Sequence, residues 1–160
     1  MRYTKCKNEI KEIQHYMRLA AEEARKSTCK KSQRGALIVK GNEVLGRGYN
    51  KVTLDALCDP CIREKISDNG RVELCSAIHA EQMAIIAAVN NRRALGGSRM
   101  YCIKIKDGQM RASGMPSCTV CSRMIYEAKI AEFVLWHKSC YAIYNAKELN
   151  ELSFKCILKS

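Results

Sequence analysis

The stretch GALIVKGNEVLGRGYN, from Gly35 to Asn50, carries the clearest fold signal in the chain. Gly35–Lys40 is apolar and rich in β-branched residues, which predicts a strand. The Gly-Asn-Glu that follows predicts a tight turn, and Val44–Asn50 the antiparallel partner. We therefore expect a β-hairpin here, forming the first two strands of a sheet.

The regions around the hairpin alternate between helical and strand patterns. Apolar residues recur at helical spacing before it, from Asn8 to about Ser27. A hairpin followed by strand–helix alternations indicates an α/β fold, a three-layer α/β/α sandwich with a mixed central sheet and helices on both faces. The later predicted elements are a long loop (51–73), helices at 79–89, 118–127 and 142–152, strands at 99–106 and 131–137, and a loop at 107–117.

Length and composition favour one domain covering residues 1–160. No apolar run approaches the roughly 20 residues that a membrane span needs. The N-terminus is charged and amphipathic and does not resemble a secretory signal, so we expect a cytoplasmic protein with no membrane partner. In that setting the ten cysteines are expected to be reduced thiols or metal ligands.

The net charge of +12 is concentrated in the first forty residues. Such a field attracts anions, including nucleotides and nucleic acid. The same charge also fits a solvated basic face that only aids solubility. No basic stripe interleaved with aromatic residues, as in single-strand-binding proteins, is visible.

Two short motifs indicate a metal site. SAIHAEQMAI places His79 two residues before Glu81, and MPSCTVCSRM places Cys118 three residues before Cys121. Buried polar groups of this kind are costly unless they are paired. Because a catalytic zinc uses three protein ligands and keeps one position for water, the histidine and the two cysteines fit such a site.

Glu81 fits the proton carrier that a hydrolytic zinc enzyme needs. It lies close to the predicted ligand His79 without being a ligand itself, and a carboxylate there can move protons between water and substrate. The alternatives are a structural zinc or no zinc, since a lone C-x2-C is often structural. A purely structural site, however, would close its fourth position with another protein ligand.

The two motifs together resemble the zinc-dependent cytidine/deoxycytidylate deaminase superfamily, with its H-x-E and P-C-x-x-C signature. Here the matches are His79-Ala80-Glu81 and Pro116-Ser117-Cys118-Thr119-Val120-Cys121, with one residue inserted after the proline. The hairpin ending in Gly-Tyr-Asn and the run CSRMIYEAKIAEFVLW are also similar to the family. The resemblance extends from about Gly35 to His137.

The resemblance implies a hydrolase acting on the C–N bonds of cyclic amidines, with deoxycytidylate, converted to deoxyuridylate, as the best single substrate. It implies that Glu81 protonates the base, that the backbone of Ala80 binds the base and that Asn50 contacts sugar or base. Asn50 is alternatively a turn residue at a strand end. The family also implies a homo-oligomer.

Two other functions stay open. Met83 stands where deoxycytidylate deaminases often have Asn and tRNA adenosine deaminases often have Met, so an RNA-editing deaminase is one alternative. A non-catalytic zinc-binding interaction module is the other. Arg47, Arg63 and Lys65 are candidate phosphate contacts by location only.

Four more cysteines lie near the middle of the chain. Some deoxycytidylate deaminases hold a second, structural zinc with ligands from these regions. The resemblance therefore suggests a second site, and free thiols are the alternative. Its ligands would be Cys29, Cys58, Cys61 and Cys75.

Overall fold

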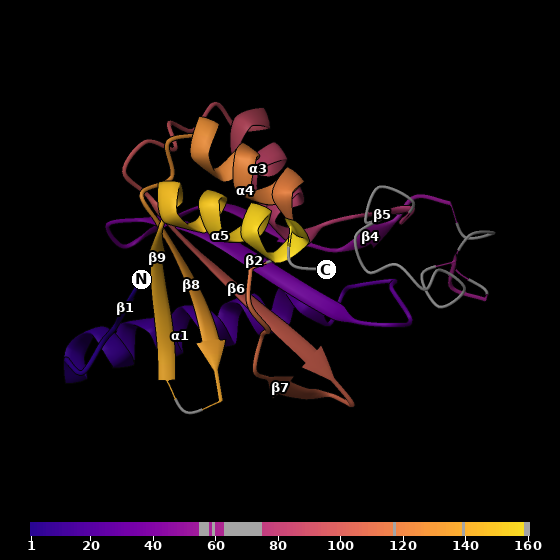
Figure 1. Ribbon diagram of the computed structural model, residues 1–160, viewed down its shortest axis with the longest axis horizontal. Coiled ribbons are helices and arrows are strands. Elements are labelled where there is room, and N and C mark those ends of the chain that lie inside the picture. The colour runs from indigo at the N-terminus through magenta and orange to yellow at the C-terminus, as the bar shows by residue number, and fades with distance from the viewer. Residues whose placement is uncertain (55–57, 59, 63–74, 117, 139, 159–160) are drawn as a thin grey trace.

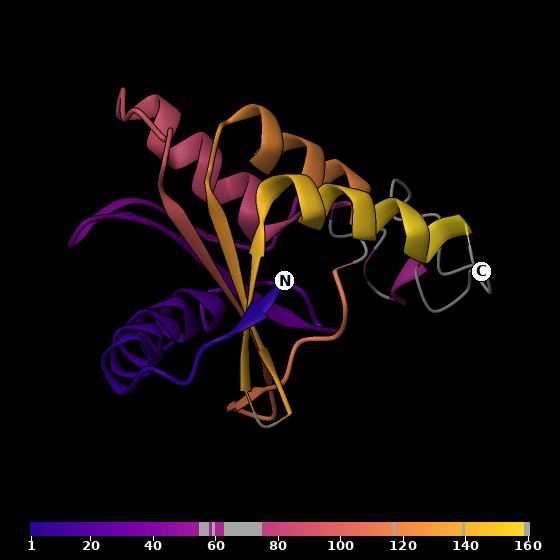
Figure 2. The ribbon, with the colours of Figure 1, turned by 60° about the vertical axis from the view of Figure 1, so that its left-hand side comes forward.

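The computed structural model describes residues 1–54, 58, 60–62, 75–116, 118–138 and 140–158. Helix α1 (Lys7–Ala24) covers one face of a central sheet (Figures 1 and 2). The other face carries α3 (Ala80–Asn90), α4 (Thr119–Glu127) and α5 (Ala146–Leu158). The predicted three-layer α/β/α sandwich is therefore confirmed.

The central sheet has seven strands in the order β1-β9-β8-β6-β2-β3, with β7 paired to β6. Strands β6 and β8 run parallel and are joined through α4, whereas the other pairs are antiparallel. The sheet is thus mixed, as expected. Its strands are β1 (Arg2–Tyr3), β2 (Gln33–Lys40), β3 (Glu43–Tyr49), β6 (Arg99–Lys106), β7 (Gln109–Arg111), β8 (Glu132–His137) and β9 (Cys140–Asn145).

A separate two-stranded ladder joins β4 (Lys51–Val52) to β5 (Ala77–Ile78), directly before α3. Within the described part of the chain, no helix is long and apolar enough to cross a membrane.

Side chains of β2 alternate between two cores. Ala36 and Ile38 belong to the cluster beneath α3, whereas Leu37 and Val39 belong to the cluster beneath α1. A strand buried on both faces needs apolar residues at every position, which explains the unbroken apolar run that marks this strand in the sequence.

Helix α3 packs against β3 through glycines. A methyl group at Gly46 or Gly48 would collide with the backbone carbonyls of Ala84 and Ala80, respectively. The missing side chains let the helix approach the strand closely, and this contact fixes the start of α3 relative to the sheet.

The predicted last helix, 142–152, is wrong at its start. Residues 140–145 form β9, and α5 begins only at Ala146. Ala142 and Tyr144 enter the core beneath α3, and Ile143 enters the core beneath α1. This two-sided burial of β-branched and aromatic residues favours the strand over the helix.

Smaller differences concern the ends and loops. The first helix ends at Ala24 rather than near Ser27. The loop predicted at 107–117 contains β7, and the long loop begins with β4. Strands β1 and β5 were not predicted; each has only two residues, too few for a pattern in the sequence.

Candidate active site

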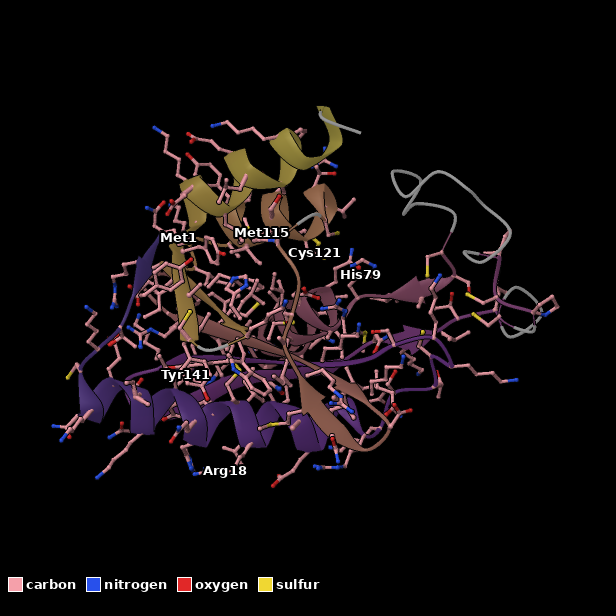
Figure 3. The ribbon with its side chains drawn as sticks, turned by 60° about the horizontal axis from the view of Figure 1, so that its bottom comes forward. Met1, Arg18, His79, Met115, Cys121 and Tyr141 are labelled. Atoms are coloured by element: carbon pink, nitrogen blue, oxygen red, sulfur yellow. The ribbon has the colours of Figure 1, made fainter. Side chains whose placement is uncertain are left out.

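Three predicted ligands meet at the starts of two helices. His79 directly precedes α3 and Cys118 directly precedes α4, and both helices lie on the same face of the sheet. His79 Nδ1 lies 3.2 Å from Cys121 Sγ, and the two sulfur atoms of Cys118 and Cys121 lie 3.1 Å apart. Figure 3 shows His79 beside Cys121, although 42 positions separate the two residues in the sequence.

These three side chains fit a metal ion. One donor atom from each lies within 4.8 Å of the others. Two ligands that are each about 2.3 Å from one ion lie at most about 4.6 Å apart, so only a small adjustment is required. Two sulfurs and an imidazole nitrogen are the donors that zinc prefers.

The helix start favours a thiolate at Cys118. Its sulfur accepts a hydrogen bond from the backbone N–H of Cys121 at 3.3 Å. The hydrogen bond between the two sulfur atoms, together with His79, lowers the pKa of Cys118 to about 4. The same hydrogen bond and burial raise the pKa of Cys121. The pair therefore shares one proton, which a metal ion would displace.

Glu81 lies in the first turn of α3 and is only 9% exposed. Its Oε1 accepts a hydrogen bond from the thiol of Cys102 at 3.6 Å, a long contact, while its Oε2 is buried with no hydrogen-bond partner among the described residues. Its charge contributes to raising the pKa of both His79 and Cys121. A buried carboxylate oxygen without a partner is costly, which is typical of a functional group.

These groups open into a cavity of about 350 Å³. That volume lies within the range of small-molecule sites. The wall combines apolar side chains with a few polar and charged groups. Those used below are Lys31, Arg34, Asn50 and Glu81.

Asn50 lines the cavity but is also firmly held by the protein. Its Oδ1 accepts hydrogen bonds from Ser27 Oγ and from the backbone N–H of Arg34, both at 2.7 Å. Its Nδ2 donates to the carbonyl of Ser32 at 2.8 Å. Asn50 therefore ties the segment before β2 to the end of β3, and one N–H of its amide stays available for a ligand.

Ala80, the predicted backbone contact, is fully buried as the first residue of α3. Its N–H belongs to the first helical turn, where no carbonyl of the helix can accept it. Arg47 does not fit the predicted phosphate contact, because it is paired with Glu23 of α1 at 3.7 Å, on the opposite face of the sheet. Arg63 and Lys65 lie outside the described residues.

The four additional cysteines are only partly gathered. Cys29, Cys61 and Cys75 line the same cavity, and Cys58 Sγ lies 3.3 Å from Ser76 Oγ. All four are half-buried free thiols. Among the described residues, only His79, Cys118 and Cys121 bring three donor atoms close enough to bind one metal ion.

Two residues of the cavity region were not singled out from the sequence. Arg34 lies in the basic stretch KKSQR and Cys102 in the strand pattern at 99–106, and neither stretch carries a site motif. The alternation of β2 could have identified Arg34, because it lies two residues before Ala36 and thus shares the α3 face. No local pattern connects Cys102 to Glu81, since their contact depends on the packing of α3.

Comparison with known proteins identifies relatives of this chain. The family described as "Cytidine and deoxycytidylate deaminase zinc-binding region" matches residues 10–137. The deoxycytidylate deaminases of Schizosaccharomyces pombe and Mycobacterium phage D29 are each 28% identical, over 78% and 76% of the chain. The chain spans 36% of the yeast relative and 91% of the phage relative.

Solved structures agree. The deoxycytidylate deaminase of cyanophage S-TIM5, in complex with dCMP and dUMP, is 26% identical over 80% of this chain and 81% of its own, with a TM-score of 0.53. The cytidine deaminase of Burkholderia pseudomallei shares the fold at a TM-score of 0.58, with 15% identity over 85% of this chain and 94% of its own.

Proposed function

Because the chain belongs to the cytidine and deoxycytidylate deaminase zinc-binding family, we propose that it converts deoxycytidylate and water to deoxyuridylate and ammonia. The observation that carries this proposal is the buried, unpartnered Oε2 of Glu81 beside the His79, Cys118 and Cys121 donors. A structural metal site would not need a buried carboxylate oxygen without a hydrogen-bond partner. Relatives named deoxycytidylate deaminase support the choice of substrate.

The proposed site residues have two roles, binding zinc and transferring protons. His79, Cys118 and Cys121 hold the zinc, which supplies a Lewis acid that makes water nucleophilic near neutral pH. Glu81 takes a proton from the water whose oxygen adds to the amino-bearing carbon of cytosine, and delivers that proton to the neighbouring ring nitrogen. The second proton of the water then passes through Glu81 to the amino nitrogen, so that the C–N bond breaks, ammonia leaves and the added oxygen remains as a carbonyl.

The charge of the cavity suits a nucleotide. Lys31 and Arg34 supply two cations, against the single carboxylate of Glu81 among the described wall residues. A net positive wall attracts a phosphate-bearing substrate more strongly than a neutral nucleoside. Lys31 is the better placed candidate for that phosphate, because it belongs to the segment before β2 and is exposed.

The test is ammonia release from a substrate panel: deoxycytidylate, cytidylate, deoxycytidine, cytidine, deoxyadenylate and bulk tRNA. We expect deoxycytidylate to give the highest kcat/KM and the Glu81→Gln variant to lose about 10²- to 10⁴-fold in kcat. Activity on tRNA alone would replace the proposal with RNA editing. No activity on any member with a full zinc content would favour the interaction module.

The second metal site is a separate proposal. Its support is the position of Cys29, Cys61 and Cys75 in the wall of one cavity. Elemental analysis of the purified protein should give two zinc ions per chain, and one ion per chain in Cys61→Ala. A wild-type content of one ion would remove the second site.

Three further proposals concern the whole protein. Residues 1–160 act as one domain, the protein is a homo-oligomer and it acts in pyrimidine metabolism in the cytoplasm. The family resemblance supports the oligomer, which light scattering with mass determination tests directly.

A further inference from the structure

Arg34 brings a cation into the wall of the candidate site. It lies on β2, two residues before Ala36, so its side chain points toward the α3 face of the sheet, where it lines the cavity. The guanidinium interacts with the thiol of Cys102 and lowers the pKa of that thiol against the effect of burial. The same thiol contacts Glu81 Oε1 at 3.6 Å. Arg34 and Glu81 therefore flank one sulfur atom.

The side chain of Arg34 has no ionic partner in the described part of the chain. The buried or half-buried glutamates of the α1 face form ion pairs with other cations. Glu23 pairs with Lys26 and Arg47, and Glu9 and Glu132 pair with Arg2 and Arg99. Arg34 is nevertheless half-buried. Cys102 offers only one weak acceptor to a guanidinium that has five N–H donors. Partial withdrawal of this charge from water is costly unless a ligand accepts the remaining N–H groups.

The cavity thus presents the guanidinium of Arg34, which has no ionic partner among the described residues, and the Oε2 of Glu81, which has no hydrogen-bond partner among them. The reacting edge of cytosine is complementary to them. It carries an amino group and a ring nitrogen that meet the carboxyl group, and a carbonyl oxygen on the far side of that ring nitrogen. Adenine has a C–H where cytosine has this carbonyl.

We propose that Arg34 is a specificity-determining residue that donates a hydrogen bond to the C2 carbonyl oxygen of the cytosine ring and so excludes adenine. This rests on the proposed deaminase function and deepens it. A donor that is left unpaired by the wrong base gives strong discrimination, because the wrong substrate covers the half-buried charge without accepting its hydrogen bond.

A contact between Arg34 and the phosphate is the competing role, and the two roles predict different kinetics. A contact with the base acts equally on deoxycytidylate and on deoxycytidine. A contact with the phosphate acts on deoxycytidylate alone. The comparison of both substrates in one variant therefore separates the roles without any assumption about the absolute rate.

The first experiment measures kcat/KM of the wild type and of Arg34→Met on both substrates. We expect the variant to lose about 10- to 100-fold on each, the range for a hydrogen bond to a charged group. A loss confined to deoxycytidylate, or no loss, would overturn the proposal. Arg47→Met is the matched control, because that arginine lies on the neighbouring strand and faces α1, and both substrates should be turned over as in the wild type.

The second experiment changes the substrate atom itself. Replacement of the C2 oxygen by sulfur, a weaker acceptor, should lower kcat/KM of the wild type and leave that of Arg34→Met nearly unchanged. An equal penalty in both proteins would show that Arg34 does not contact this atom.

A binding measurement keeps the proposal separate from catalysis. Deoxyuridylate retains the C2 carbonyl, so calorimetry should give weaker binding of this product to Arg34→Met than to the wild type. A wild type without deaminase activity would refute the proposed function. Equal product affinity of the two proteins would refute the role of Arg34. Arg34→Lys, which keeps the charge, should recover part of the binding and guards against a folding defect in the methionine variant.

Discussion

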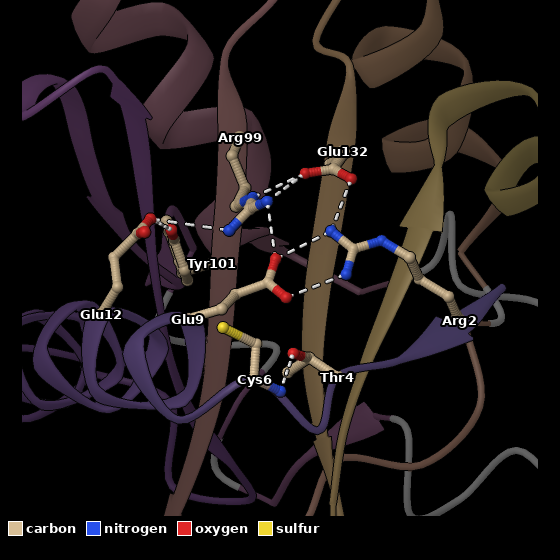
Figure 4. Close-up of polar contacts among 8 residues, drawn as sticks. All are labelled: Arg2, Thr4, Cys6, Glu9, Glu12, Arg99, Tyr101 and Glu132. Atoms are coloured by element: carbon tan, nitrogen blue, oxygen red, sulfur yellow. Dashed lines mark hydrogen bonds and ion pairs between the residues drawn. The ribbon is translucent and has the colours of Figure 1, made fainter.

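The buried carboxylates on the two faces of the sheet differ in their hydrogen-bond partners. On the α1 face, Glu9 receives hydrogen bonds from Arg2 at 2.8 and 2.9 Å and from Arg99 at 3.1 Å, and Glu132 receives one from Arg99 at 2.7 Å (Figure 4). On the α3 face, Glu81 is buried with one oxygen unpartnered. The first arrangement joins β1, α1, β6 and β8, whereas the second leaves a group available for chemistry. A carboxylate with its partners in place contributes to the stability of the fold, whereas a buried carboxylate oxygen without a partner is typical of a functional site.

The largest expected effect comes from Glu81→Gln. The amide fills the same space but cannot carry a proton, so we expect kcat to fall by about 10²- to 10⁴-fold, the usual contribution of general acid–base catalysis. Thermal unfolding should occur at the same or a higher temperature, because an unpaired carboxylate is removed. Ammonia release and calorimetry measure the two effects.

The control for this variant is its zinc content. Elemental analysis should give the same amount as in the wild type, since Glu81 is not a proposed ligand. A rate close to that of the wild type would remove Glu81 from the mechanism. Loss of zinc together with loss of activity would instead assign Glu81 to the metal site.

A glycine packs against a helix on each face of the sheet, so alanine variants test the packing of the two faces separately. Gly48→Ala would push a methyl group into the Ala80 carbonyl at the start of α3, whereas Gly35→Ala would push one into the Ala20 carbonyl of α1. We expect both variants to lose about 1–3 kcal/mol of unfolding free energy, the usual cost of overpacking. Only Gly48→Ala should also lower kcat/KM, by about tenfold or more, because Glu81 and His79 move with the start of α3.

Denaturant unfolding and steady-state kinetics at a temperature where both variants are folded separate these effects. Equal kinetic losses in both variants would indicate that the site responds to general loosening rather than to the position of α3.

A smaller effect is expected from Glu132→Gln on the α1 face. The amide loses the charge that faces Arg2 and Arg99, which should lower the unfolding free energy by about 1 kcal/mol. Substrate turnover should stay within about twofold of the wild type, because none of these residues lines the cavity. A large loss of turnover with unchanged stability would contradict the division between the two faces.

Local sequence patterns were sufficient to select the three side chains that the structure brings together, His79, Cys118 and Cys121. Each motif lies at the start of a helix and can be read locally, whereas the contact between the two motifs depends on the fold. The strand at 99–106 was predicted with the bounds that β6 has. The same local patterns could not distinguish helix from strand for YAIY, at 141–144, because this segment forms a strand by pairing with β8.

Contacts between distant segments were beyond reach of the sequence for a similar reason. Five hydrogen bonds join Asn50 to Ser27 and Ser32, before β2, and to Arg34, in β2, and they explain why Asn50 is buried. The sequence shows only a polar residue at a strand end. The environment of Arg34 likewise depends on Cys102 and Glu81, which come from two other elements. Roles that rest on such pairings have to be taken from the fold.

The smallest effect concerns the pH dependence that Glu9 gives to stability. The hydrogen bonds from Arg2 lower the pKa of Glu9 to about 2, against a value near 4.5 in the unfolded chain. A carboxyl group whose pKa is lower in the folded state stabilises the fold above the unfolded pKa, and this contribution is lost as the pH falls from 4.5 toward 2. The Glu9→Gln variant should therefore be less stable than the wild type at pH 6, by about 1 kcal/mol or less once solvent screening is included. Toward pH 2 the two proteins should become equally stable. Denaturant unfolding of both proteins after zinc removal measures the difference, and the other titrating groups cancel between them. A gap that stays constant down to pH 2 would mean that Glu9 acts through its shape and packing, and that the α1 face does not owe its stability to the paired charge.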